Sequence, residues 1–176
     1  MERVQREGPV AYEHIVITGK SGAGSSTTAV NITAALAEEG YRVALVGYDA
    51  RRLSTAPLRG DGQRAACGEE CQEGRISCVL GYQGILCLEA ANGDEGKGGA
   101  VFDRLCRFEA LARHRIDFVV HDIPGNPETV LSFISRTDDP WRLFVVTSAD
   151  IASIHTLNGF IARFNELGGE KGRFGG

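Results

Sequence analysis

A short stretch near the start of the chain carries residues whose types and spacing suit phosphate binding. It reads G-K-S-G-A-G-S-S-T from Gly19 to Thr27 and follows an apolar run, Ile15 to Thr18. Glycines let backbone N–H groups point inward around an anion, and a helix that begins here adds unpaired N–H donors and a partial positive charge. The stretch is therefore predicted to bind the phosphates of a nucleotide.

The pattern G-x-x-x-x-G-K-[ST] fits Gly19 to Ser26 in every position but one. Ser25 stands where the lysine that neutralises the β- and γ-phosphates is expected, and Lys20 stands directly after the first glycine. Ser26 is predicted to be a Mg²⁺ ligand. Thr27 either donates to the α-phosphate or is simply a first-turn helix residue. The predicted nucleotide-binding set is Gly19, Lys20, Gly22, Ala23, Gly24, Ser25, Ser26 and Thr27.

A carboxylate that ends a later apolar run is the second candidate for this site. The run from Ile116 to Asp122 reads as a strand and is followed by Pro124 and Gly125. In P-loop enzymes an acidic residue at such a strand end holds Mg²⁺ close to the phosphate loop. Asp122 is therefore predicted to be a metal ligand together with Ser26, and a helix-cap or turn carboxylate is the alternative.

Apolar runs and amphipathic segments alternate along the chain. Such alternation predicts an α/β fold with a doubly wound, mostly parallel sheet in three layers, like that of P-loop NTPases. We expect one domain, 1–176, with a long polar loop region at 50–84. The expected strands are Ile15–Thr18, Tyr41–Gly47, Ile85–Ala90, Ile116–Asp122 and Leu143–Thr147, and the expected helices are Ser25–Gly40, Ala100–Arg113, Glu128–Ser135 and Ile151–Leu167.

Composition limits the classes of partner. The 176 residues are 43% hydrophobic and carry a formal net charge of −4, without a block of Lys or Arg, so we expect neither a nucleic-acid nor a membrane partner. No signal-peptide core or membrane-spanning run is visible, and we expect a cytoplasmic protein. Cys67, Cys71 and Cys78 are either free thiols in a loop or metal ligands. The four histidines form no catalytic arrangement, and we assign them no catalysis.

Several motifs together resemble those of the nitrogenase iron protein family, which includes the iron-protein subunits of dark protochlorophyllide and chlorophyllide reductases. They are G-K-S-G-A-G-S-S-T-T, H-D-I-P-G and F-N-E-L-G-G, with Lys20 as the mark of the deviant P-loop. The resemblance implies ATP or ADP with Mg²⁺, and a homodimer or pairing with a related iron-protein or reductase component. It implies catalytic roles for Lys20, which reaches the partner's nucleotide, and Asp49, which activates water. Gly125 would sense the γ-phosphate.

The chain departs from the family pattern at functional positions. The family's second aspartate, four residues after Asp49, falls on Leu53, and the two cluster cysteines fall on the Gly98-Gly99-Ala100 run and on Thr129. Since a [4Fe–4S] cluster needs converging thiolates, we expect none held by family-type ligands. The family also starts another strand where this chain reads G-G-E-K-G-R-F-G-G, so the chain is C-terminally short relative to it.

Three functional hypotheses remain open at this point. The first is a nucleotide-dependent dimeric switch, acting as an assembly or regulatory factor, with weak or no hydrolysis because Ser25 replaces the lysine. The second is an active ATPase or reductase component, coupling ATP hydrolysis to electron transfer, in which Lys20 supplies the missing charge. The third is an interaction module that binds no nucleotide.

Overall fold

A mostly parallel sheet forms the centre of the molecule. The computed structural model describes residues 12–48, 55–59, 76–90, 115–123, 125–135 and 140–167. Six strands lie in the order β3-β4-β2-β5-β1-β6. Their bounds are β1 Glu13–Gly19, β2 Val43–Gly47, β3 Ile76–Leu80, β4 Leu86–Ala90, β5 Phe118–Asp122 and β6 Trp141–Val146. All pairs are parallel except β3 with β4, which confirms the predicted doubly wound, mostly parallel α/β fold.

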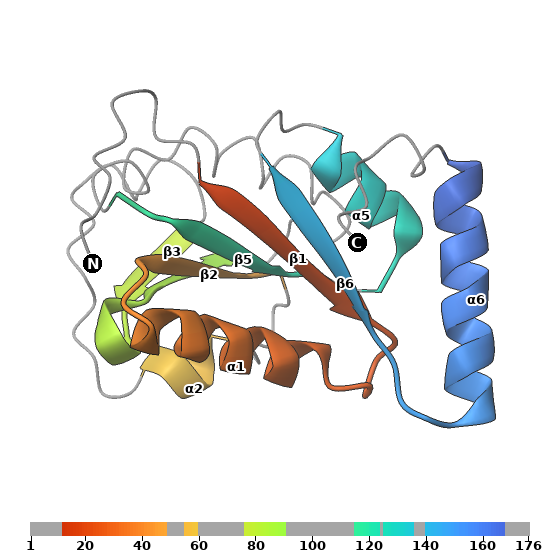
Figure 1. The fold of residues 1–176 in the computed structure, drawn as a ribbon, viewed down its shortest axis with the longest axis horizontal. Coiled ribbons are helices and arrows are strands. Elements are labelled where there is room, and N and C mark those ends of the chain that lie inside the picture. The colour runs from red at the N-terminus through yellow and green to blue at the C-terminus, as the bar shows by residue number, and fades with distance from the viewer. Residues whose placement is uncertain are drawn as a thin grey trace.

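Helices cover both faces of this sheet (Figure 1). The helices α1 and α2 lie on one side, and α5 lies on the other, with α6 beside it at the β6 end. A 3-10 turn, η2 (Tyr82–Gly84), connects β3 to β4. The helix bounds are α1 Ser25–Glu38, α2 Ala56–Arg59, α5 Pro127–Ile134 and α6 Ile151–Glu166. None of the helices within the described residues is long and apolar enough to span a bilayer.

The strand β1 is buried on both faces, as expected of a central strand in a parallel sheet. Because successive side chains of a strand alternate between faces, Ile15 and Ile17 pack with Ala29 of α1. Val16 packs on the other face with Phe133 of α5 and Phe164 of α6. These two packed layers fix the end of β1, and with it the start of the glycine-rich turn.

The region 50–84 differs from its prediction as a long polar loop without regular elements. It contains α2, β3 and η2, and β3 pairs antiparallel with β4 in the register Val79 to Cys87. The chain turns tightly at Gly81, where a Cβ would lie 2.2 Å from the carbonyl oxygen of Leu58. The predicted helix Ala100–Arg113 lies outside the described residues.

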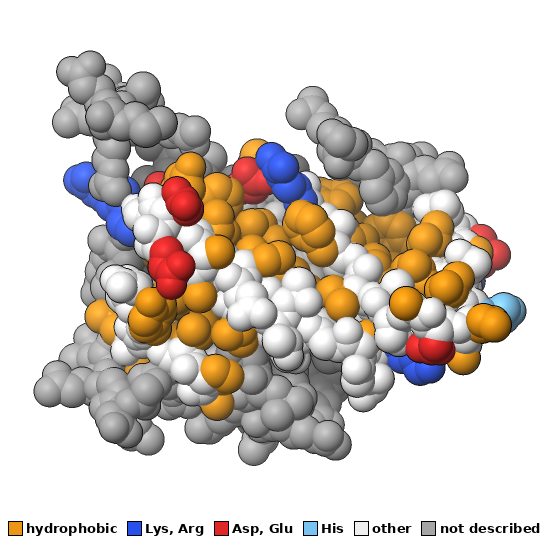
Figure 2. All heavy atoms as spheres, turned by 60° about the horizontal axis from the view of Figure 1, so that its bottom comes forward, with side chains coloured by type: hydrophobic (Ala, Val, Ile, Leu, Met, Phe, Trp, Pro, Cys, Tyr) orange, Lys and Arg blue, Asp and Glu red, His pale blue; other side chains and the backbone are white. Residues whose placement is uncertain are grey.

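The helix α6 is the least covered of the long helices in the described part of the chain. Only Ser153 and Phe164 are buried among its 16 residues. Its exposed side carries Ile151, which is 88% exposed, and also Ile154 and Ile161. Apolar side chains gather at this end of the molecule in Figure 2.

Candidate functional site

The turn between β1 and α1 has the backbone of a phosphate-binding loop. Gly22 and Gly24 adopt φ values of 84° and 93°, a conformation that side chains disfavour, and the N–H of Ala23 donates to the Lys20 carbonyl at 2.9 Å. Gly24 is the N-cap of α1 and offers no side-chain oxygen to the first turn. The N–H groups of the first turn are therefore available for an anion, which is the geometry that the glycine pattern predicts.

The two predicted metal ligands meet at this turn. The Ser26 hydroxyl donates to Oδ2 of Asp122 at 2.7 Å. Asp122 is only 5% exposed, and the parallel register of β1 and β5 sets it opposite Ile17, two residues before Gly19. A hydroxyl and a carboxylate are hard oxygen ligands, which Mg²⁺ prefers. The pair therefore fits the magnesium site expected from the sequence.

Gly125 lies directly against the loop. A Cβ at Gly125 would lie 2.2 Å from the carbonyl oxygen of Gly19 and 3.4 Å from the backbone nitrogen of Lys20. A Cβ at Gly19 would in turn lie 2.5 Å from the carbonyl oxygen of Val146. Only glycines fit these contacts, so the backbones at the ends of β1 and β6 and the start of α5 converge beside the phosphate loop.

Lys20 lies near the start of α6. It is exposed and lines a cavity that it shares with Ser153 and Thr156 of α6. The pKa of Asp150, the N-cap of α6, lies well below its usual range, mainly because Ser148 and Ser153 donate hydrogen bonds to it, and also because of the charge of Lys20. The cation that follows the first glycine is therefore close enough to α6 to stabilise a carboxylate there.

The remaining loop residues add no charge. Ser25 begins α1 and is half-buried, whereas Thr27 is exposed on the first turn of α1. Ala23 lies in the turn between the two positive-φ glycines. Within 19–27, Lys20 is the only residue with a cationic side chain.

Asp49 and Leu53, which the resemblance connects to water activation and magnesium, lie outside the described residues. The strand that precedes them is described. Gly47, the last residue of β2, pairs with Asp122 on β5. The chain therefore leaves β2 beside the carboxylate of the candidate magnesium site.

A buried pair of histidines lies beneath the site, and sequence reasoning missed it. Nδ1 of His14 and Nε2 of His121 are 2.8 Å apart, and the Tyr48 hydroxyl is 3.2 Å from Nδ1 of His121. Burial, together with the charge on His14, holds the pKa of His121 well below its usual value. The two histidines are 107 residues apart in sequence. The available signal was a histidine directly before the first apolar run, Ile15 to Thr18, and another within the run Ile116 to Asp122.

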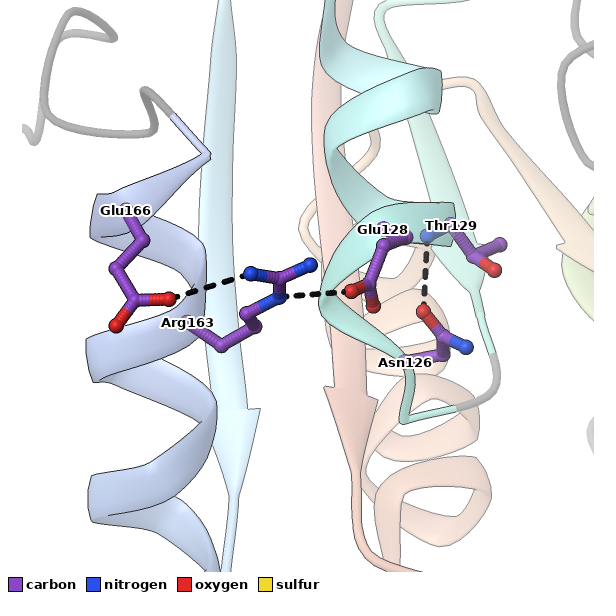
Figure 3. A network of polar contacts seen from close by, with 5 residues as sticks. All are labelled: Asn126, Glu128, Thr129, Arg163 and Glu166. Atoms are coloured by element: carbon purple, nitrogen blue, oxygen red, sulfur yellow. Dashed lines mark hydrogen bonds and ion pairs between the residues drawn. The ribbon is translucent and has the colours of Figure 1, made fainter.

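Thr129, at the position of a family cluster cysteine, lies in the first turn of α5. Its backbone N–H donates to Oδ1 of Asn126 at 3.1 Å (Figure 3). The preceding residue connects this turn to α6, because Nε of Arg163 donates to Oε1 of Glu128 at 2.9 Å (Figure 3). A threonine hydroxyl does not replace a thiolate as a cluster ligand. Residues 98–100, the other cluster position, lie outside the described residues.

Solved structures with the same fold include nucleotide-dependent proteins. A ParA family ATPase from Chlorobium tepidum TLS has a TM-score of 0.62 and 16% identity, over 88% of this chain and 68% of that one. Cobyrinic acid a,c-diamide synthase from Mycobacterium smegmatis, solved with an ATP analogue and magnesium, has a TM-score of 0.60 and 21% identity, over 89% and 68%. At these identities the similarity shows the fold.

Curated relatives are more similar in sequence. Nitrogenase iron protein 2 of Methanothermococcus thermolithotrophicus is 30% identical over an alignment 187 positions long, gaps included, which covers 90% of this chain and 64% of the relative. Nitrogenase iron protein 2 of Paenibacillus durus is 29% identical over 174 residues, covering 91% and 59%. The chain thus spans less than two thirds of the length of these relatives. The model of the 4Fe-4S iron sulfur cluster binding proteins, NifH/frxC family, matches residues 13–172, and the chain therefore belongs to this family.

Proposed function

We propose that this protein is a nucleotide-dependent switch that binds ATP or ADP with Mg²⁺, hydrolyses ATP slowly or not at all, and acts as an assembly or regulatory factor. The observation that carries the proposal is the hydrogen bond of 2.7 Å between Ser26 and Asp122 at the base of the glycine-rich turn. It brings both candidate magnesium ligands to the N-terminus of α1, where phosphates bind in this fold.

Binding would use groups that are already in place. Backbone N–H groups from Gly22 to Ser26 would surround the β-phosphate, and Ser26 with Asp122 would hold Mg²⁺, which neutralises the phosphate oxygens when it is bound. Gly125 lies against Gly19, so its backbone N–H is a candidate sensor of the γ-phosphate. The positions of these groups around the glycine-rich turn therefore support nucleotide binding.

Slow hydrolysis follows from Ser25. A lysine ammonium about 3 Å from a phosphate oxygen would contribute roughly 5 kcal/mol of attraction at an effective dielectric near 20, before desolvation is subtracted. A serine hydroxyl supplies none of that charge. Transition-state stabilisation in phosphoryl transfer depends on such charges. The absence of the lysine charge should therefore reduce the rate of hydrolysis more than it reduces nucleotide affinity, because the backbone N–H groups still bind the phosphates.

The switch would operate without the family's [4Fe–4S] cluster. Thr129 offers a hydroxyl where the family has a cysteine, and the first cluster position reads Gly98-Gly99-Ala100. Electron transfer through such a cluster is therefore not part of the proposal. The remaining function is association between proteins that changes when nucleotide binds. The partner would be a second copy of this chain, in a homodimer, or a related iron-protein or reductase component, in the cytoplasm.

Lys20 is the residue that would connect nucleotide to association. It is exposed beside the phosphate loop, and its side chain leaves the loop five residues before Ser25. In the family, the lysine at this position serves the nucleotide of the opposite subunit. A catalytic contribution of Lys20, and of Asp49, would therefore require the dimer.

Calorimetric titration with Mg-ATP and Mg-ADP tests the proposal. We expect weak binding of both nucleotides by wild-type protein, an increase in dimer on binding ATP, and turnover far below that of an ordinary family member. Asp122→Asn should weaken the Mg²⁺-dependent part of binding. No binding of either nucleotide would favour the interaction module, and turnover at an ordinary family rate would favour the ATPase or reductase component.

A further inference from the structure

A cavity of about 260 Å³ lies beyond the phosphate loop, between the loop and α6. The end of β6 and the starts of the loop and of α5 form part of its lining, and α6 closes the opposite side. Its apolar lining comes from Pro127, Val145, Val146, Leu157 and Phe160. The volume is slightly below the range of drug-sized ligand pockets. A small, largely apolar molecule therefore suits it.

Gly159 contributes to this space from the middle of α6. A Cβ built at Gly159 meets no atom within 4 Å, and the backbone there has no positive φ that would require glycine. Glycine destabilises a helix interior relative to alanine. Neither crowding nor backbone conformation explains it, and its consequence is open space beside α6, at the exposed edge of the cavity.

The polar groups at the cavity define what one end of a ligand should carry. The hydroxyls of Thr147 and Thr156 already donate to backbone carbonyls, at 3.3 Å and 2.9 Å, so neither hydroxyl proton is left for an anionic ligand. Lys20 is the cationic donor among the lining residues. The carboxylate of Asp150 already interacts with Lys20 across the same end of α6. Because Asp150 already offsets part of the charge of Lys20, a ligand with a single negative charge suits Lys20 better than a doubly charged phosphate.

We infer that this cavity binds a small amphipathic carboxylate, with its apolar body between Leu157, Phe160 and Val145 and its carboxylate on Lys20. The inference goes beyond the proposed function and does not depend on it, because the cavity exists without nucleotide. Lys20 and Gly125 line the cavity and also belong to the candidate nucleotide site. A bound carboxylate therefore competes with nucleotide for contact with Lys20, and it would act as an effector of the nucleotide site.

Titration of the nucleotide-free protein with hexanoate, monitored by ¹H–¹⁵N NMR, tests the site. We expect shifts of the amides of Leu157, Gly159 and Phe160, and affinity that rises from butanoate to hexanoate and then levels off as the cavity fills. Hexan-1-ol should bind at least fivefold more weakly than hexanoate. Lys20→Gln should weaken hexanoate and leave hexan-1-ol unchanged.

Variants of neighbouring α6 residues separate cavity binding from surface adsorption. Gly159→Leu fills the cavity and should weaken hexanoate at least tenfold, about 1.4 kcal/mol. Asn158→Leu adds the same side chain at the neighbouring position, which is not among the residues that line the cavity, and should leave binding unchanged. Circular dichroism and thermal unfolding confirm that both variants fold, and Gly159→Ala, a smaller filling, provides an intermediate if Gly159→Leu does not fold.

The expected pattern identifies the cavity, and three results would overturn the inference. They are no saturable hexanoate binding, binding that Gly159→Leu and Gly159→Ala leave intact, and equal binding of hexanoate and hexan-1-ol. A nucleotide titration on the same samples keeps the two proposals distinct. Hexanoate binding in a protein that binds no Mg-ATP would support the carboxylate site and contradict the nucleotide switch. Mg-ATP binding without hexanoate binding would support the switch and contradict the carboxylate site.

Discussion

The Ser26 hydroxyl and the Asp122 carboxylate, 96 residues apart in sequence, meet in a hydrogen bond of 2.7 Å. Their meeting follows from the sheet, because β1 and β5 are parallel neighbours and α1 begins directly after the turn that ends β1. The carboxyl ends of parallel strands are where ligands bind in doubly wound folds. This one contact therefore places the candidate magnesium site where the phosphate loop needs it.

Asp122→Asn should remove the dependence of nucleotide affinity on Mg²⁺. The amide keeps the size of the side chain and can still accept from Ser26, but it lacks the charge that attracts the cation. We expect Mg²⁺ to tighten ATP binding at least tenfold in wild-type protein and less than twofold in the variant, measured by calorimetry with and without EDTA.

Asp117→Asn is the matched control for this change. Asp117 directly precedes Phe118, the first residue of β5, and is thus at the end of the strand opposite Asp122. Its side chain accepts a hydrogen bond from the Arg42 backbone N–H at 2.8 Å. It should retain the wild-type response to Mg²⁺. An equal loss in both variants would show that overall charge, and not the Ser26 and Asp122 pair, governs the effect.

Ser25→Lys should tighten Mg-ATP binding at least tenfold, about 1.4 kcal/mol. The substitution restores a full positive charge at the start of α1, next to the β- and γ-phosphates. Asn31→Lys, an exposed position further along the same helix, adds the same charge away from the loop and should change affinity little. Wild-type protein that already binds as tightly as Ser25→Lys would show that another group neutralises the phosphates.

The buried His121 should make the apo-protein less stable in mild acid. Its pKa is lowered in the fold, mainly by burial, so between that value and the ordinary value near 6.5 the unfolded chain binds more protons than the folded one. The free energy of unfolding then falls as pH decreases below about 6.5, by at most roughly 1.4 kcal/mol per pH unit for one proton. Above that pH this contribution is constant.

Urea unfolding at a series of pH values checks this dependence. His121→Phe keeps an aromatic ring against Phe133, whose centroid is 4.4 Å from the His121 ring, and should flatten the curve between pH 5 and 6.5. His155→Gln, on the exposed side of α6, should leave it unchanged. A slope that persists undiminished in His121→Phe would assign it to other groups.

The sequence predicts the elements of the site better than the interactions beneath it. Gly19, Ser26 and Asp122 could be grouped because local patterns identify a glycine turn and a strand-end carboxylate, and parallel topology brings such ends together. The contact between His14 and His121 depends on the register of β1 against β5. No local pattern specifies that register, so these histidines could not be assigned a role.

The region 50–84 illustrates the same limit in the fold. The strand β3 has a single partner within the described sheet, β4, and pairs with it antiparallel across Gly81 to Gly84. The many glycines and polar residues around it mask this short apolar run, and only its pairing with Leu86 to Leu88 makes it a strand. By contrast, α5 begins and ends one residue before its predicted bounds, and α6 begins at Ile151 as predicted and ends one residue early. The side chains of Asn126 and Asp150 cap the starts of these two helices.

Anaerobic reconstitution with iron and sulfide should yield no stoichiometric [4Fe–4S] cluster on family-type ligands. Thr129 has no thiol, and neither do Gly98, Gly99 and Ala100. Iron and sulfide assays and visible absorption measure the outcome. A triple variant with serine at Cys67, Cys71 and Cys78 is the control for these other thiols, of which Cys78 lies on β3, and a full cluster that survives in it would contradict the reasoning.

Gly125→Ala should destabilise the protein and weaken nucleotide binding together. The added Cβ would lie 2.2 Å from the carbonyl oxygen of Gly19, which is backbone and cannot rotate away. Overpacking of this kind typically costs about 1–3 kcal/mol. Relief of the clash would displace either the phosphate loop or the start of α5, so calorimetry with Mg-ATP should show weaker binding in the molecules that remain folded.

Gly159→Ala is the matched control, because it adds the same methyl group where no atom lies within 4 Å. It lies within α6, so it should raise the free energy of unfolding by up to about 1 kcal/mol through helix propensity. Its Mg-ATP affinity should equal that of wild-type protein. Opposite signs of the two stability changes in urea unfolding would establish that the contact between Gly125 and Gly19, and not the loss of a glycine as such, holds the start of α5 against the phosphate loop. Equal stability of Gly125→Ala and wild-type protein would contradict that contact.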